Sequence, residues 1–159
     1  MPNQYQAALV SQLITWLLII AGWVIVHYLT LTRERQKEIR DLKSKIVEYI
    51  LEIEKRSIAF HQSPNHNSDE ARNLVAEIGR VSTAIARRPL SLLCISPRVI
   101  RQFRSGVTLK NFDPSSFQSQ PATSRLLSDI SLRTEALINA LEEAYSRRYL
   151  HGWWQVFRV

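Results

Sequence analysis

The sequence predicts an all-α protein in which one N-terminal transmembrane helix continues into a cytoplasmic antiparallel helical bundle. Three observations lead to this prediction. Residues 7–31 contain no acidic or basic side chain except His27. Good helix formers follow, without Pro or Gly between positions 36 and 58. Apolar residues then recur at helical spacing in three further segments, and no stretch keeps a strand-like alternation for more than a few residues.

These segments divide the chain into three parts. Residues 1–32 form an N-terminal tail and the transmembrane helix, residues 33–152 the cytoplasmic helical bundle, and residues 153–159 an aromatic C-terminal tail. The part outside the span, about 130 residues, is enough for one small helical domain and too short for two.

The transmembrane prediction depends on length and flanking charge. A helix rises about 1.5 Å per residue, so residues 7–31 can cross a hydrocarbon core of about 30 Å. Arg and Lys cluster from Arg33 onward, whereas residues 1–6 have neither, which predicts a single-pass protein of the inner (plasma) membrane with its N-terminus outside. A buried soluble helix and a cleaved signal peptide are the alternatives. A signal peptide would need basic residues before the apolar run and a small-residue cleavage site after it, where Tyr28 and Leu29 stand.

The first helix is expected to continue unbroken to about His61, roughly 55 residues in all. In its cytoplasmic part a heptad seam, apolar except at Arg56, steps by three and four: Ile39, Leu42, Ile46, Tyr49, Ile53, Arg56 and Phe60. The seam fits either an intermolecular coiled coil or the inward stripe of an antiparallel bundle. The bundle is favoured, because two later helices have apolar stripes of their own to bury.

Turn and capping residues bound the second helix. Pro64 and its polar neighbours predict a turn, after which Asn67 or Ser68 caps the helix. The helix must end near Arg88, because Pro89 disfavours helical geometry at the residue before it. Its predicted apolar stripe is Leu74, Ile78, Val81 and Ile85.

Two further helices are expected. Ser96 and Pro97 favour the start of a short third helix, with Gly106 as its stop and a polar loop to residue 120. A last helix with a broad apolar face is expected from about residues 121–124 to Leu150.

Residues 87–110 are strongly basic and contain no acidic side chain, in a chain of net charge +7. If the second helix folds back along the first, it brings this segment toward the inner leaflet, where anionic head groups attract each basic residue by about 1 kcal/mol. The candidate residues for contact with anionic lipid or a partner are Arg87, Arg88, Arg98, Arg101 and Arg104. A solvated face without a partner is one alternative. Nucleic acid is a disfavoured partner, since Phe103 and Phe112 are the only nearby aromatic residues and no binding module accompanies them.

Several residues of the span are smaller or more polar than a solitary lipid-facing helix requires. Small residues permit close approach of helices, and hydroxyl or imidazole groups hydrogen-bond between them. This indicates a homo-oligomer or docking onto another membrane protein, with Ser11, Thr15, Ala21, Gly22 and His27 as candidate association residues. For His27 an interfacial position beside Trp23 and Tyr28 is favoured over a proton relay.

The C-terminal tail is a candidate aromatic anchor. Trp153, Trp154 and Phe157, near three arginines, suit insertion into a membrane interface; capping of the bundle core and contact with a partner are the alternatives.

No pattern indicates an enzyme, a metal centre or a cofactor site. His61 and His66 flank Pro64 without a third ligand and are interpreted as two loop histidines. Cys94, the single cysteine, excludes an intramolecular disulfide, and its apolar neighbours predict a buried, inert thiol.

Two functional classes follow from this architecture. One is an effector that oligomerises through its span and perturbs the membrane; the other is a membrane-tethered scaffold or regulatory subunit that recruits a partner. In its architecture, one span joined to a helical cytoplasmic part, the chain resembles the small membrane effectors of bacterial antiviral systems. That resemblance implies the effector class, with membrane lipids and further copies of the chain as partners.

Overall fold

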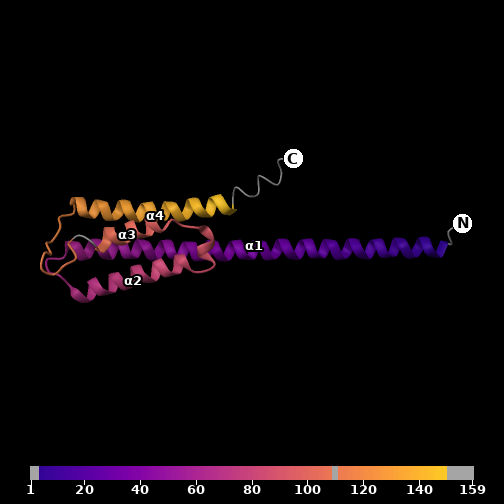
Figure 1. Ribbon diagram of the computed structural model, residues 1–159, viewed down its shortest axis with the longest axis horizontal. Coiled ribbons are helices and arrows are strands. Elements are labelled where there is room, and N and C mark those ends of the chain that lie inside the picture. The colour runs from indigo at the N-terminus through magenta and orange to yellow at the C-terminus, as the bar shows by residue number, and fades with distance from the viewer. Residues whose placement is uncertain (1–3, 109–110, 150–159) are drawn as a thin grey trace. The chain divides into compact units, whose positions relative to one another are not determined.

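The computed structural model describes residues 4–108 and 111–149, with side chains from residue 9 onward, and all of its regular elements are helical (Figure 1). These elements are α1 (Gln4–Gln62), α2 (Ser68–Ala86), the 3₁₀ turn η1 (Leu90–Leu93), α3 (Pro97–Thr108) and α4 (Arg125–Tyr149). The chain divides into two compact units, Met1–Glu38 and Ile39–Val159, called unit 1 and unit 2 below. The prediction of an all-α fold is confirmed.

Helix α1 runs for 59 residues without interruption. Proline is absent between Pro2 and Pro64, and proline is the residue that most strongly breaks a helix interior. The predicted single long first helix is therefore confirmed, and the predicted turn follows it at residues 63–67.

The part of α1 that belongs to unit 2 packs into a bundle core. Ile39, Ile53 and Phe60 of the predicted seam are buried, and Leu42, Ile46 and Tyr49 are partly buried against the same core. The bundle interpretation of the seam is therefore confirmed. A second stripe, which the heptad reading missed, is buried beside the first: Lys43, Ile50, Ser57 and His61.

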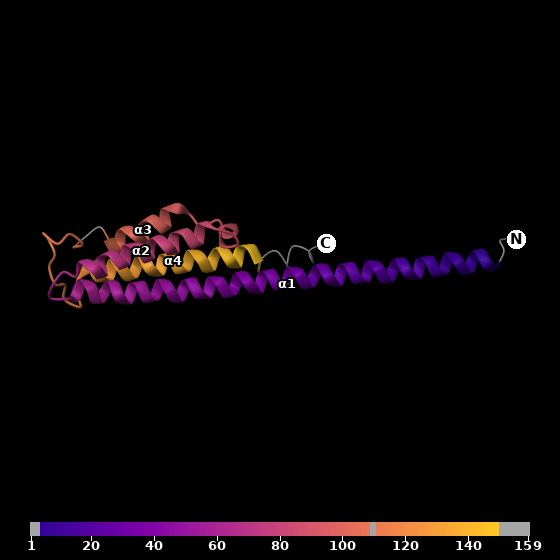
Figure 2. The same cartoon turned by 90° about the horizontal axis from the view of Figure 1, so that it is seen from below.

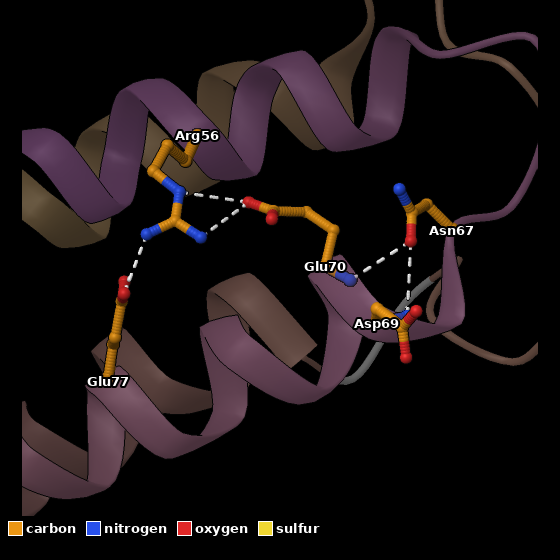
Figure 3. Close-up of polar contacts among 5 residues, drawn as sticks. All are labelled: Arg56, Asn67, Asp69, Glu70 and Glu77. Carbon is orange, nitrogen blue, oxygen red and sulfur yellow. Dashed lines mark hydrogen bonds and ion pairs between the residues drawn. The ribbon is translucent and has the colours of Figure 1, made fainter.

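Helix α2 is capped as expected. The side-chain oxygen of Asn67 accepts hydrogen bonds from the backbone N–H groups of Asp69 and Glu70, both at 3.1 Å (Figure 3). The acidic side chains of this first turn also suit the positive end of the helix dipole. All four residues of the predicted apolar stripe are buried, and the helix ends at Ala86, within two residues of the expected position.

Within unit 2, α2 and α4 run antiparallel to α1, as two views at right angles agree (Figures 1 and 2). Arg56 near the end of α1 binds Glu70 at the start of α2, and Lys43 binds Glu142 near the end of α4. The predicted antiparallel arrangement is therefore confirmed.

Helix α3 differs from the prediction at its C-terminal end. It continues two residues beyond Gly106, the expected stop, and Val107 of its last turn is fully buried. Gly106 has a different use: a methyl group there would lie 2.5 Å from Cδ of Arg133. The guanidinium of Arg133 donates hydrogen bonds to Gln102 O (3.1 Å) and Ser105 Oγ (2.8 Å), so α4 and α3 approach closely where the glycine leaves room.

Aromatic and imidazole rings fill the turn between α1 and α2. Phe60 contacts His61, His66, Phe112 and Phe117, with ring centroids 5.1–5.5 Å apart. The interpretation of both histidines as loop residues is wrong for His61, which lies in the last turn of α1 and is fully buried. Its Nε2 lies 3.4 Å from the carbonyl of Val107, and burial lowers the pKa of the His61 imidazole.

Candidate membrane interface

The described side chains of residues 9–31 in unit 1 are all exposed, although most of them are apolar. Leu17 is 66 % exposed, Trp23 66 % and Tyr28 70 %, values that a water-soluble helix of this composition would reduce by packing. Among the described helices, α1 alone is long and apolar enough to cross a membrane. The bundle of unit 2 buries its apolar core, so the large exposed apolar surface of α1 is confined to residues 9–31.

Three threonine hydroxyls in and directly after this segment are satisfied within the helix. Thr15 Oγ1 donates to Ser11 O, Thr30 Oγ1 to Val26 O and Thr32 Oγ1 to Tyr28 O, each at 2.9 Å. The transfer of such a hydroxyl from water to lipid costs little free energy, because it still donates its hydrogen bond to the backbone carbonyl one turn earlier. These threonines are therefore compatible with a lipid environment.

The five candidate association residues do not share one face. At about 100° per residue, Ser11, Thr15 and Gly22 fall within about 40° of one another around α1. Ala21 lies about 100° from the centre of that group and His27 about 140°. A methyl group at Gly22 would meet no atom within 4 Å, so the glycine leaves a shallow place on the face that Ser11 and Thr15 share.

His27 stacks on Trp23, one turn earlier on the same helix. The ring centroids lie 5.3 Å apart and the planes differ by 3°. This contact holds the imidazole beside an indole ring, a side chain that favours the membrane–water interface.

The five candidate arginines of unit 2 are all exposed. Their guanidinium groups form no ion pair with any described residue. Arg87 and Arg88 follow the end of α2 and lie beside the first turns of α1 in unit 2, whereas Arg98, Arg101 and Arg104 follow one another along α3. The structure thus divides the candidates into two groups. One is the pair Arg87 and Arg88, and the other is the row of three arginines on α3.

The pair belongs to a groove of about 710 Å³ between α1, α2 and η1, called the α1–α2 groove below. Its basic residues are Lys45, Arg80, Arg87 and Arg88, and its large apolar residues are Leu42, Ile46, Pro89 and Leu90. Sequence reasoning missed Lys45 and Arg80. Arg80 of α2 and Arg87, the residue directly after the helix, are seven positions apart, about two helical turns, and this spacing was the available signal. Lys45 joins them only through the antiparallel packing.

Cys94 corrects a further expectation. Its side chain is exposed, not buried, and its backbone has a left-handed conformation (φ 54°) at the end of η1. The 3₁₀ turn directs Leu90 and Leu93, three residues apart, into the core instead. The next residue, Cys94, therefore faces solvent.

Trp153, Trp154 and Phe157, the predicted aromatic anchor, lie outside the described residues. No group of three His, Cys, Asp or Glu side chains that could hold a metal ion occurs in residues 4–108 and 111–149. No protein-family model, no curated protein and no solved structure matches the chain.

Proposed function

We propose that this chain is a non-enzymatic, single-span protein of the inner membrane that self-associates through α1 and perturbs the membrane as an effector. The observation on which the proposal mainly depends is the exposed apolar surface of residues 9–31. Its length, about 34 Å as a helix, matches the hydrocarbon core of a bilayer.

Self-association is supported by the shared face of Ser11, Thr15 and Gly22. Lipid tails are as apolar as leucine, so helices associate in a bilayer where small residues allow their backbones to approach. Thr15 already donates its proton within its own helix, so close packing, and not a new donor, is the expected contribution of this face.

The basic surface of unit 2 supports a cytoplasmic location beside anionic lipid. Its five exposed arginines have no ion partner among the described residues, so they are attracted to a negatively charged leaflet and break no ion pair on reaching it. The Arg and Lys cluster from Arg33 favours the same orientation, with the N-terminus outside.

Cys94 provides a direct test of location and orientation, since it is the one cysteine of the chain and its side chain is exposed. The chain should stay in the membrane pellet after alkaline carbonate extraction. In intact spheroplasts a membrane-impermeant maleimide should leave Cys94 unlabelled and should label it after permeabilisation. A matched variant, Asn3→Cys with Cys94→Ser, should already be labelled in intact spheroplasts. Release of the chain by carbonate, or labelling of Cys94 in intact cells, would refute the proposal.

A scaffold or regulatory subunit is the second candidate, favoured by the row of exposed arginines on α3. Expression separates the two classes. An effector depolarises the cells that produce it, and changes of the span abolish that effect. A scaffold is harmless, and it loses its function when Arg98, Arg101 and Arg104 are changed to glutamate.

A further inference from the structure

We propose that the α1–α2 groove is a binding site for one anionic phospholipid, with the phosphate held by the groove's basic residues and an acyl chain lying over its apolar residues. This inference rests on the proposed membrane location and goes beyond it. General attraction to a charged leaflet requires only exposed cations, whereas a bound lipid requires cations and an apolar surface in one concave site.

The charge of the α1–α2 groove favours an anionic ligand. Lys45, Arg80, Arg87 and Arg88 converge on the groove from α1, α2 and the segment after α2, and no acidic side chain lines it. None of the four forms an ion pair elsewhere in the described part of the chain. Four like charges that gather without a counter-ion repel one another, and a phosphate relieves that repulsion through charge-assisted hydrogen bonds.

The apolar residues of the groove favour a ligand that carries an acyl chain. Leu42, Ile46, Pro89 and Leu90 line the same space as the cations. A free phosphate would leave these surfaces in water, whereas an acyl chain covers them. The volume of about 710 Å³ lies within the range of about 300–1,000 Å³ typical of small-molecule sites.

The short chain segment between the proposed span and the groove favours a ligand from the membrane. Leu42 in the groove lies eleven positions after Leu31, the last of the exposed apolar run. Even a fully extended chain of that length reaches only about 40 Å. A span within the bilayer therefore keeps the groove at a high effective concentration of lipid head groups.

The test measures lipids retained by the full-length chain, extracted in detergent and analysed by native mass spectrometry. Phosphatidylglycerol and phosphatidylcholine with the same acyl chains are added at the same concentration. The wild type should retain one phosphatidylglycerol per protomer and no phosphatidylcholine. Glycerol 3-phosphate, which has the phosphate and no acyl chain, should not displace the lipid.

Two matched pairs of variants locate the site. Arg80→Gln with Arg87→Gln removes two charges from the groove, and Arg98→Gln with Arg101→Gln removes two charges, also exposed, from α3. The groove pair should retain phosphatidylglycerol about tenfold more weakly, and the α3 pair should resemble the wild type. Equal losses in both pairs would show diffuse adsorption and would overturn the proposal.

Gly79 permits a test that leaves the charge unchanged. It lines the groove, and a Cβ atom at this position would meet no atom within 4 Å, so Gly79→Phe should fill the groove and expel the lipid. Val75→Phe, one turn earlier on an exposed part of α2 outside the groove, is the control. Retention of phosphatidylglycerol that Gly79→Phe leaves unchanged would overturn the proposal. So would groove variants that keep the lipid but lose an acidic protein that co-purifies with the wild type.

Carbonate extraction of the same variants separates the two proposals. Groove variants that stay in the membrane pellet and retain phosphatidylglycerol as strongly as the wild type refute the groove site alone. A wild-type chain that leaves the pellet refutes the membrane function, and the groove site with it.

Discussion

Arg56 and Glu77 join the first two helices of the bundle through a contact of 2.6 Å between Nη1 and Oε1 (Figure 3). The two side chains are 29 % and 15 % exposed, and Arg56 also binds Glu70 at 2.8 Å. The hydrogen bonds that Arg56 donates to Glu77 and then to Glu70 raise the pKa of its guanidinium above its already high value, so the group is charged at any working pH. This network fixes α2 against α1.

Removing Arg56 should therefore destabilise the bundle. Arg56→Ala leaves the Glu77 carboxylate, one oxygen of which is already buried without a partner, as an uncompensated charge, and should lower the free energy of unfolding by about 2 kcal/mol. Arg72→Ala is the matched control, because Arg72 is 81 % exposed and its pairing with Asp69 should contribute less than about 0.5 kcal/mol. Urea unfolding followed by circular dichroism measures both. Equal effects would contradict a special role of Arg56.

Gly106→Ala should weaken the contact between α3 and α4. The new methyl group would displace the Arg133 side chain and break its bonds to Gln102 and Ser105, with an expected loss of about 1 kcal/mol. Gly79→Ala, in an open place on α2, should instead stabilise the helix by about 0.5–1 kcal/mol. The loss from Gly106→Ala should largely vanish in an Arg133→Ala background, and a double-mutant cycle that shows no coupling would refute this account.

His61 should make the stability of the bundle depend on pH. Burial lowers the pKa of His61 in the folded protein below the 6.5 of an exposed imidazole, so the unfolded chain binds a proton more readily. Stability is then fully present above about pH 6.5 and falls as the pH drops from there toward the folded pKa. His61→Leu should flatten the melting temperature between pH 7.5 and 5.5, and His66→Gln, a change at the half-buried histidine beside it, should not. An unchanged pH profile in His61→Leu would contradict the assignment.

The face of Ser11, Thr15 and Gly22 should govern self-association of the span. Gly22→Ile blocks close helix approach there and should weaken association in vesicles by about tenfold, as measured by energy transfer between labelled chains. Ala21→Ile adds the same bulk about 100° away around the helix and is the control. In cells, Ser11→Leu and Thr15→Leu should likewise suppress depolarisation. Equal effects of Gly22→Ile and Ala21→Ile would refute a defined association face.

Local features of the fold were predictable because their causes are local. Asn67 is the cap of α2 since its oxygen reaches the next free N–H groups, and the stripe from Leu74 to Ile85 is buried since its spacing makes one apolar face. The exposed candidates Arg87 and Arg98 could be named from charge alone. None of these inferences required knowledge of a distant part of the chain.

The wider face of α1 could not be predicted in the same way. A heptad pattern identifies one stripe, but a helix that contacts neighbours on two sides buries two. Ile50 and His61 lie on the second stripe, and Lys43 is buried there because Glu142 of α4 meets its charge. Hydropathy does not predict that a lysine is buried, so the burial of Lys43 is explained only by its partner Glu142.

The sequence by itself determined the helical class, the order of the helices and the long apolar segment, because propensity, capping and hydropathy act over a few residues. Tertiary structure alone decided the use of Gly106, the exposure of Cys94 and the joining of Lys45 to Arg80 and Arg87 in one groove. Each of these depends on which residues distant in the chain pack together, and the antiparallel fold of α2 against α1 sets that pairing.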